Sequence, residues 1–301
     1  MTQLHILPSV SATPGPNHNP IVLAERYLLQ RILGVGGMGV VYKARDLLRA
    51  SLGDPHPWVA LKTLGRDMRE HQGADALLFG EYRLGMRLRH GNVVKHLHYD
   101  LCPQHRYGFF TQELVAGQTM EERLQQGPTP PPMLRLKWAR QLVAAVQHCH
   151  EQSVIHADLK PANLLLDQND DVLLFDFGIG RLSDGSDAPF RLNREQLDAW
   201  SYRYAAPELF NGALPSVGTD VFSLGCVIYQ LLALTHPLGQ GTTDSLIEQP
   251  MQWVPPTRHR RLNRALLTAL SVLPDQRHVT LVELAQELND AAATPNRWLR
   301  A

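Results

Sequence analysis

The chain contains 301 residues, 44% of them hydrophobic, which is enough to bury a substantial core in one large domain or in two lobes. Lysine plus arginine and aspartate plus glutamate each total 29, so no bulk charge attracts the chain to nucleic acid or to an anionic membrane. Three cysteines without a CxxC pair argue against a disulfide framework or a zinc ribbon, and they favour a reducing compartment.

The sequence shows neither a secretory signal nor a membrane span. Residues 1–10 lack a basic stretch followed by an apolar run. The longest strongly apolar stretch, residues 221–234, is shorter than the roughly twenty residues that cross a bilayer. We therefore expect a soluble, cytoplasmic protein.

The first part of the chain is predicted to be rich in strands. Residues 1–20 are rich in proline and show no periodicity, which predicts a disordered tail. Short β-branched runs between turn signals then predict strands at 32–35, 40–44 and 58–64. An apolar stripe predicts a helix at 75–89.

The second part is predicted to be mainly helical. Apolar periodicity after the proline run at 128–132 predicts helices at about 133–151, 219–234, 262–271 and 280–290. We expect a domain at 21–290, with a first lobe at 21–115 and a second at 116–290, and a C-terminal tail at 291–301.

The glycine segment at residues 34–39 lies between two predicted strands. Missing side chains allow backbone amides to approach phosphate oxygens closely. From the glycines alone, a tight hairpin without a ligand is the favoured interpretation. The segment continues into a strand and carries no Gly-Lys-Ser/Thr, which excludes a dinucleotide fold and a Walker loop.

A lysine and a glutamate occur at positions that predict burial. Lys62 lies in an apolar strand, and Glu81 lies on the apolar stripe of the following helix. We expect the two to pair and to hold the lysine toward nucleotide phosphates. A structural ion pair, or two separately solvated side chains, remains the alternative.

The segment HADLKPAN at 156–163 places a base, a cation and an amide within one loop. Asp158 can accept the proton of an attacking hydroxyl, and Lys160 can neutralise charge on a transferring phosphoryl group. Asn163 can bind magnesium through its carbonyl oxygen. A predicted hairpin over 164–175 would return Asp176 to Asn163, so the two could share one Mg²⁺. An acidic turn residue is the alternative for Asp176.

Three other patterns are interpreted as packing or surface. His148-Cys149-His150 lacks a fourth ligand nearby in sequence, so we interpret it as helix packing and not as a metal site. Met133 and Trp138 are expected in the helix core. Arg258, Arg260 and Arg261 form a short basic cluster that we interpret as a solvated face, with docking of an acidic partner as the alternative.

The glycine segment, VALK at 59–62, HADLKPAN, DFG at 176–178 and AAPE at 205–208 stand in order along the chain. This set resembles the eukaryotic-type (Hanks-type) serine/threonine protein kinases, and VYKARD after the glycines is most similar to their bacterial branch. The resemblance covers about residues 27–288. It implies an α+β, bilobal protein kinase fold with a small antiparallel sheet and one regulatory helix in the first lobe, and a larger, mainly α-helical second lobe.

The resemblance also implies an ATP site. Gln112 would be the gatekeeper, the backbones of Glu113 and Val115 would bind adenine, and Leu165 would cover one face of the ring. The implied ATP-binding set is Leu33, Gly34, Val35, Gly36, Gly37, Met38, Gly39, Val41, Ala60, Lys62, Gln112, Glu113, Val115 and Leu165.

Several supporting residues follow from the same resemblance. Asp220 would accept hydrogen bonds from the backbone of the catalytic loop, and Glu208 would pair with Arg277. Ser201 would help to dock the substrate, and together with LKPAN it is typical of kinases specific for serine and threonine.

Two positions depart from the family pattern. Ala157 replaces the usual arginine, which contacts a phosphate on the activation loop. We therefore expect activity that does not require phosphorylation of Ser183 or Ser186. Gly85 replaces a bulky apolar residue expected to stack with His156 and Phe177, so we expect a mobile helix that is seated by an outside contact, either an activating protein partner or the proline-rich tail.

The sequence predicts an ATP-dependent protein serine/threonine kinase that phosphorylates protein substrates, with Mg²⁺ or Mn²⁺ as the metal and with autophosphorylation. A pseudokinase scaffold acting through protein contacts is the alternative, and a small-molecule kinase is a third hypothesis. Retention of Lys62, Glu81, Asp158, Asn163 and Asp176 favours the active enzyme. The oligomeric state cannot be derived from these patterns.

Overall fold

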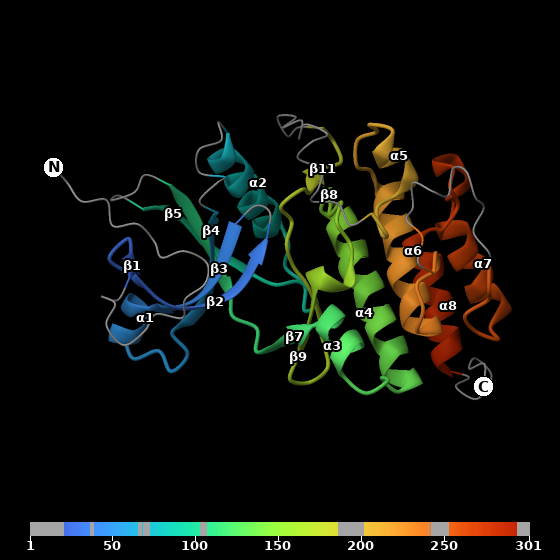
Figure 1. Cartoon of the computed structure of the whole chain (residues 1–301), viewed down its shortest axis with the longest axis horizontal. Helices are drawn as coiled ribbons and strands as arrows, with labels where there is room; N and C mark the ends of the chain where they lie inside the picture. The colour runs from blue at the N-terminus through green and yellow to red at the C-terminus, as the bar shows by residue number, and fades with distance from the viewer. Residues whose placement is uncertain are drawn as a thin grey trace. The chain divides into compact units, whose positions relative to one another are not determined.

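A computed structural model describes residues 21–36, 39–65, 68, 73–102, 107–185, 202–239, 241 and 253–293 (Figure 1). The predicted tail at 1–20 lies outside the described residues, as do Gly37, Met38, Ser186 and Ser201. The chain divides into two compact units. The first comprises residues 1–79 and 96–114, and the second comprises residues 80–95 and 115–301.

An antiparallel sheet of six strands builds the first unit, in the order β1-β2-β3-β4-β6-β5. Its core consists mainly of alternate inward-facing residues such as Tyr27, Ala44 and Phe109, which are at most 1% exposed. The strands are β1 (Val22–Leu23), β2 (Tyr27–Gly36), β3 (Gly39–Asp46), β4 (Trp58–Leu64), β5 (His96–Leu101) and β6 (Gly108–Glu113).

Two helices accompany this sheet along the chain. Helix α2 (Ala74–Arg87) is the predicted one, and the boundary between the two units falls within it. Helix α1 (Leu47–Ser51) is a further short helix that was not predicted. The reason is physical, because a helix of this length is too short to show an apolar period and depends on its cap for stability.

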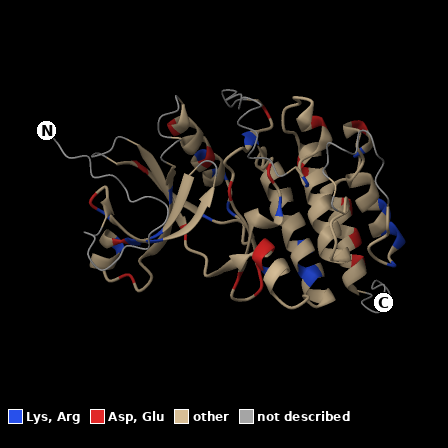
Figure 2. Ribbon diagram, in the orientation of Figure 1, with Lys and Arg blue, Asp and Glu red and all other residues tan. Residues whose placement is uncertain are grey.

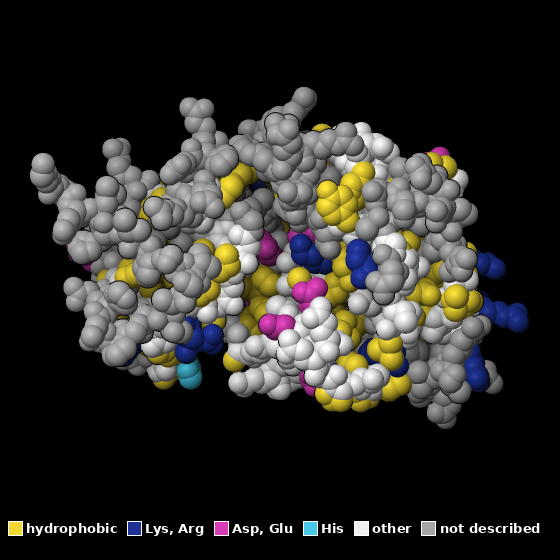
Figure 3. All heavy atoms as spheres, in the orientation of Figure 1, with side chains coloured by type: hydrophobic (Ala, Val, Ile, Leu, Met, Phe, Trp, Pro, Cys, Tyr) yellow, Lys and Arg dark blue, Asp and Glu magenta, His cyan; other side chains and the backbone are white. Residues whose placement is uncertain are grey.

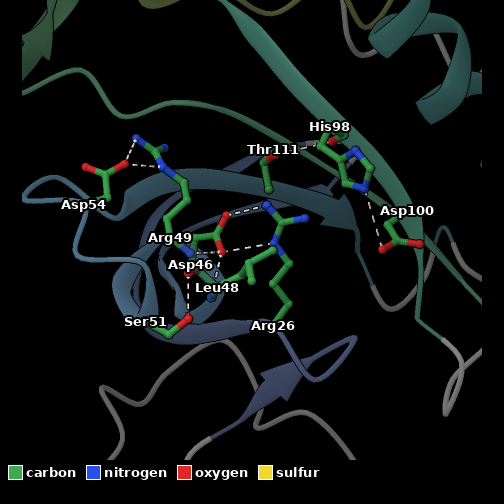
Figure 4. Close-up of polar contacts among 9 residues, drawn as sticks. All are labelled: Arg26, Asp46, Leu48, Arg49, Ser51, Asp54, His98, Asp100 and Thr111. Atoms are coloured by element: carbon green, nitrogen blue, oxygen red, sulfur yellow. Dashed lines mark hydrogen bonds and ion pairs between the residues drawn. The ribbon is translucent and has the colours of Figure 1, made fainter.

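The cap of α1 is Asp46, a carboxylate that is only 1% exposed (Figure 4). It accepts hydrogen bonds from the backbone N–H groups of Leu48 and Arg49 at 3.1 and 3.2 Å. It also pairs with the Arg26 guanidinium in two bonds of 3.0 and 2.7 Å. Burial opposes ionisation of Asp46, but these partners outweigh it and lower the pKa of the carboxyl.

The second unit is mainly helical. Helix α6, predicted from its apolar character on nearly all sides, is buried along almost its whole length against α4 and α7. The helices are α3 (Met120–Gln126), α4 (Pro132–Glu151), α5 (Pro207–Phe210), α6 (Val217–Ala233), α7 (Arg260–Ala269) and α8 (Leu281–Ala293), with 3₁₀ turns at Pro161–Asn163 and Pro274–Gln276.

Short strands complete this unit and confirm, with the helices, the predicted α+β class. The predicted hairpin at 164–175 is formed by β9 (Leu164–Asp167) and β10 (Val172–Leu174), and β7 (Gly117–Thr119) pairs with β9. Strands β8 (Val154–Ile155) and β11 (Arg181–Leu182) form a separate pair. No helix in the described part of the chain is long and apolar enough to cross a membrane.

The core of α4 differs in one position from the prediction. Trp138 is fully buried, as expected, but the side chain of Met133 is 47% exposed. Met133 lies in the first turn, before the helix reaches the core residues that begin with Arg135 and Leu136.

The predicted ion pair between Glu208 and Arg277 is confirmed at 2.5 and 2.7 Å.

Substitution of Asp46 tests the anchor of α1. Asp46→Ala removes the helix cap and leaves Arg26 without its carboxylate, so we expect a loss of about 2–4 kcal/mol in the free energy of unfolding. Urea unfolding followed by circular dichroism measures this loss. Because the pKa of Asp46 is lowered in the folded state, its contribution should be present at neutral pH and fade as the pH falls below the usual carboxylate range.

Asp54→Ala is the matched control, since this carboxylate pairs with Arg49 at the surface of the same unit. Both side chains of this ion pair are partly exposed to solvent. The loss in the free energy of unfolding should therefore be clearly smaller than for Asp46→Ala. An equal loss in the two variants would contradict the role assigned to Asp46.

Candidate active site

The catalytic loop predicted at 156–163 lies between β8 and β9 in the second unit, and it ends in a 3₁₀ turn. Asp158 and Lys160 form an ion pair of 2.7 Å. The side-chain nitrogen of Asn163 donates to the backbone oxygen and to the carboxylate of Asp158, both at 2.9 Å. The loop therefore brings the three predicted side chains into one hydrogen-bonded group.

The hairpin places Asp176 beside this group. Its strands pair Leu166 with Val172 and Leu164 with Leu174, and the backbone N–H of Phe175 donates to the carbonyl oxygen of Asn163 at 3.2 Å. The predicted return of the chain to Asn163 is thus confirmed. Asp176 itself adopts φ = +68°, a left-handed backbone that is unusual outside glycine.

A buried carboxylate holds the start of the catalytic loop, as the family resemblance implied. Asp220, in the first part of α6, is fully buried and accepts hydrogen bonds from the backbone N–H groups of His156 and Ala157 at 2.9 and 2.8 Å. The second of these bonds fixes Ala157 at φ = +67°, where non-glycine residues need outside support.

Sequence reasoning missed the third partner of Asp220. The ring nitrogen Nε2 of His150 lies 2.9 Å from its carboxylate, and the pair is almost completely removed from solvent. His150 was interpreted as packing, and its partner is 70 positions away in the sequence. The only sequence signal is that a polar residue on the inner side of an amphipathic helix, next to buried Cys149, requires some polar partner; this signal does not identify Asp220.

The turn of the hairpin is held by α4. Trp138 donates its indole N–H to the carbonyl oxygen of Asp170 at 3.1 Å, and Gln141 bonds both the carboxylate of Asp171 at 2.5 Å and the backbone N–H of Val172 at 3.0 Å. Lys137 pairs with Asp171 at 2.8 Å. These supports were not predicted, because their partners come from a distant turn.

Electrostatics make Asp158 a group that can exchange a proton near neutral pH. Burial raises its pKa to about 6, Lys160 opposes the shift, and Asp176 adds to it. His156 is fully buried, and burial lowers its pKa, which keeps the ring neutral. Its Nε2 atom lies 3.1 Å from the carbonyl oxygen of Phe175, and its ring lies 4.8 Å from that of Phe177.

The donor set fits a hard divalent cation. In the described part of the chain, no cluster of three or more His, Cys, Asp or Glu side chains could hold a metal alone. Mg²⁺ needs fewer protein ligands, since it keeps waters and is completed by substrate phosphates. The side chain of Asn163 bonds Asp158 through its nitrogen, so the side-chain oxygen of Asn163 and the Asp176 carboxylate are the atoms suited to this ion.

The first unit contains most of the predicted nucleotide-binding residues, whereas Val115 and Leu165 belong to the second unit. Strands β2 and β3 pair Gly34 with Val41 and Gly36 with Gly39, and a Cβ at Gly39 would collide with the carbonyl oxygen of Thr63. Ala60 and Gln112 are opposite each other on β4 and β6 and are buried.

The remaining predicted residues differ in exposure. Leu33 and Val35 are exposed, whereas Glu113, Val115 and Leu165 are half-buried. Lys62 and Glu81 are 7% and 3% exposed, so each is buried as predicted. Their pairing stays a prediction, and so does the effect of Gly85. The roles of Gly37, Met38 and Ser201 fall outside the described residues.

Asp158→Asn tests the electrostatics of the loop. The raised pKa means that wild-type Asp158 destabilises the fold once it is ionised, and this cost develops as the pH rises from about 4 to about 6. The asparagine variant lacks that cost, so its stability relative to wild type should increase over the same range, by at most about 3 kcal/mol. Thermal unfolding at a series of pH values measures the difference. A difference that does not change with pH would contradict the raised pKa.

Comparison with known proteins agrees with this geometry. Residues 27–279 match the family described as protein kinase domain. Among curated relatives, the serine/threonine-protein kinase PknB of Mycolicibacterium smegmatis is 29% identical, over 89% of this chain and 43% of its own length. PknD of Mycobacterium tuberculosis is 28% identical, over 89% and 40%. The kinase pkn3 of Myxococcus xanthus is 28% identical, over 88% and 50%.

The chain therefore spans only about half or less of the length of these relatives. The matched region nevertheless includes strands β2 to β6 of the sheet, the catalytic loop, the hairpin and the Glu208–Arg277 pair. The family implies binding of ATP and a divalent metal and action on protein substrates. These relatives are named as serine/threonine-protein kinases or bear kinase names, and the chain itself belongs to the protein kinase domain family.

Proposed function

We propose that this chain is an active kinase that transfers the γ-phosphoryl group of ATP to serine and threonine hydroxyls of protein substrates, including its own. The observation that carries the proposal is the hydrogen-bonded group of Asp158, Lys160 and Asn163 with Asp176 beside it. A scaffold would not need a buried carboxylate with a raised pKa next to a lysine, since this arrangement costs stability.

Each side chain of the group has a distinct task. Asp158 would orient the substrate hydroxyl and accept its proton, and a pKa of about 6 leaves the carboxylate ionised at neutral pH while keeping it a useful base. Lys160, at 2.7 Å from Asp158, would place its positive charge near the transferring phosphoryl group. Asn163 and Asp176 would hold Mg²⁺, or Mn²⁺ in its place, and the metal supplies charge neutralisation when bound.

The first unit would supply most of the nucleotide-binding groups, and Val115 and Leu165 belong to the second unit. The glycine-lined β2–β3 hairpin would present backbone amides to phosphate oxygens, and Lys62 would contact the phosphates. Gln112, Glu113 and Val115 would bind adenine, and Val41, Ala60 and Leu165 would enclose it, as the family resemblance implies.

Replacement of the proposed base tests the function. Wild-type chain incubated with labelled ATP and Mg²⁺ should label itself and a generic protein substrate, and Asp158→Asn should reduce the rate by roughly 10²–10⁴-fold. Because the side chain keeps its size, loss of the proton acceptor is the main change. Radiolabel incorporation measures the rate.

Asp170→Asn is the matched control, because this exposed carboxylate lies in the turn of the neighbouring hairpin. The control should retain the wild-type rate. If the wild-type chain binds ATP but transfers no phosphoryl group, the proposal of an active kinase is wrong and the scaffold hypothesis is favoured.

We also propose that activity does not depend on phosphorylation of the activation segment. Ala157 occupies the position of the family arginine, is 4% exposed and has no charged group with which to bind a phosphate. Its backbone N–H is held by Asp220 instead, so the loop is fixed from the core of the second unit.

The variant Ser183→Ala/Ser186→Ala tests this independence. Together with phosphatase-treated wild type, it should phosphorylate the generic substrate at the untreated wild-type rate, because no cation at position 157 would gain from a phosphate. Initial rates with labelled ATP provide the comparison. A large decrease in the initial rate of both samples would contradict this independence and indicate that phosphorylation of the activation segment is required.

A further inference from the structure

A cluster of unpaired arginines stands at the start of α7, far along the chain from the catalytic loop. Arg258, Arg260, Arg261 and Arg264 are all exposed, and none makes a hydrogen bond or an ion pair within the described part of the chain. The sequence from Gln249 to Pro274 contains no aspartate or glutamate. A chain whose charges balance overall therefore concentrates positive charge on one helix. We call these four residues the α7 basic patch.

The figures show this concentration directly. Figure 2 colours the start of α7 as basic, and Figure 3 shows lysine and arginine side chains projecting into solvent at the edge where α7 lies. Glu287 of the neighbouring α8 faces His259, at 3.6 Å, and does not neutralise the patch. The first turn of α7 contains no acidic residue. Arginines at this end of a helix are unfavourable to the helix dipole, so helix stability does not explain them.

The α7 basic patch is held on a rigid base. Thr257, only 1% exposed, and Asn263 exchange hydrogen bonds of 2.9 Å that close the turn carrying Arg258. His259 caps α7 by accepting a bond from the backbone N–H of Leu262 at 3.2 Å. The inner face of α7 is buried against α6 and α8. The arginine Cα positions are thereby fixed before any partner arrives, which reduces the entropy cost of binding.

The outer face of α7 combines charge with one apolar side chain. Arg260, Arg264 and Leu267 follow one another at spacings of four and three, so they form a single stripe along the helix. Leu267 is 42% exposed. Arginine forks bind carboxylates through two parallel hydrogen bonds, and an apolar residue beside them adds contact area.

We propose that the α7 basic patch with Leu267 is a docking surface for an acidic polypeptide segment that carries an apolar residue. Charge complementarity selects this occupant. A duplex nucleic acid is less suitable, because tight binding uses about six to ten phosphate contacts and a domain with a basic overall charge. An anionic membrane is less suitable, because the apolar face of α7 is committed to the core and cannot insert.

Binding of a synthetic acidic peptide tests the proposal. A dye-labelled peptide of glutamates flanking one leucine should bind the purified chain, and its glutamine counterpart should not. Arg260→Glu/Arg264→Glu should raise the Kd about tenfold or more, since two guanidinium groups are lost and two carboxylates that repel the peptide are added. Fluorescence anisotropy at physiological salt measures the Kd, and thermal unfolding verifies that the variant is folded.

Arg31→Glu/Arg45→Glu is the matched control, because it makes the same charge change at exposed arginines of the first unit. The control should bind the peptide as wild type does. An equal loss in both variants would reduce the effect to general surface charge and overturn the proposal. Tighter binding of duplex DNA or of phosphatidylserine vesicles at the same patch would also overturn it, because the occupant would then be a different polyanion.

Discussion

The second unit depends on one buried carboxylate. Asp220 has no access to solvent, and an isolated charge there would be very costly, yet its oxygens meet two backbone N–H groups and the ring of His150. The carboxylate and the catalytic loop stabilise each other. The carboxylate is tolerated because the loop surrounds it with donors, and the loop keeps its unusual backbone because the carboxylate is there.

This mutual support explains why chemistry and stability oppose each other in the catalytic loop. Ala157 and Asp176 both have left-handed backbones, each with a cost of order 1–3 kcal/mol. Asp158 adds the cost of a buried charge. The hydrophobic packing of α4 and α6 and the Asp220 hydrogen bonds offset these costs. The strained and partly charged catalytic loop is thereby anchored to α6, which is buried along most of its length.

Much of this arrangement could be predicted from the sequence. Hairpin and helix periodicity are local properties, and the tasks proposed for Asp158 and Asn163 follow from chemistry confined to one short loop. The bond between His150 and Asp220 could not be predicted, because periodicity shows that a side chain faces inward but not which distant residue it meets. Helix α1 was missed for a different reason, since its stability comes from the cap and the Arg26 ion pair rather than from an apolar stripe.

The β9–β10 hairpin sets the position of the two residues that we propose as metal ligands. Its pairing register brings Asn163, just before β9, and Asp176, just after β10, to the same open end of the hairpin, and α4 holds the turn at the other end through Trp138 and Gln141. Side chains alternate between the two faces of a sheet along a strand. One inserted or deleted residue would therefore move every later side chain of that strand to the opposite face. Surface turns usually tolerate changes in length during evolution. This turn, although exposed at its tip, should be constant in length wherever the chemistry is retained.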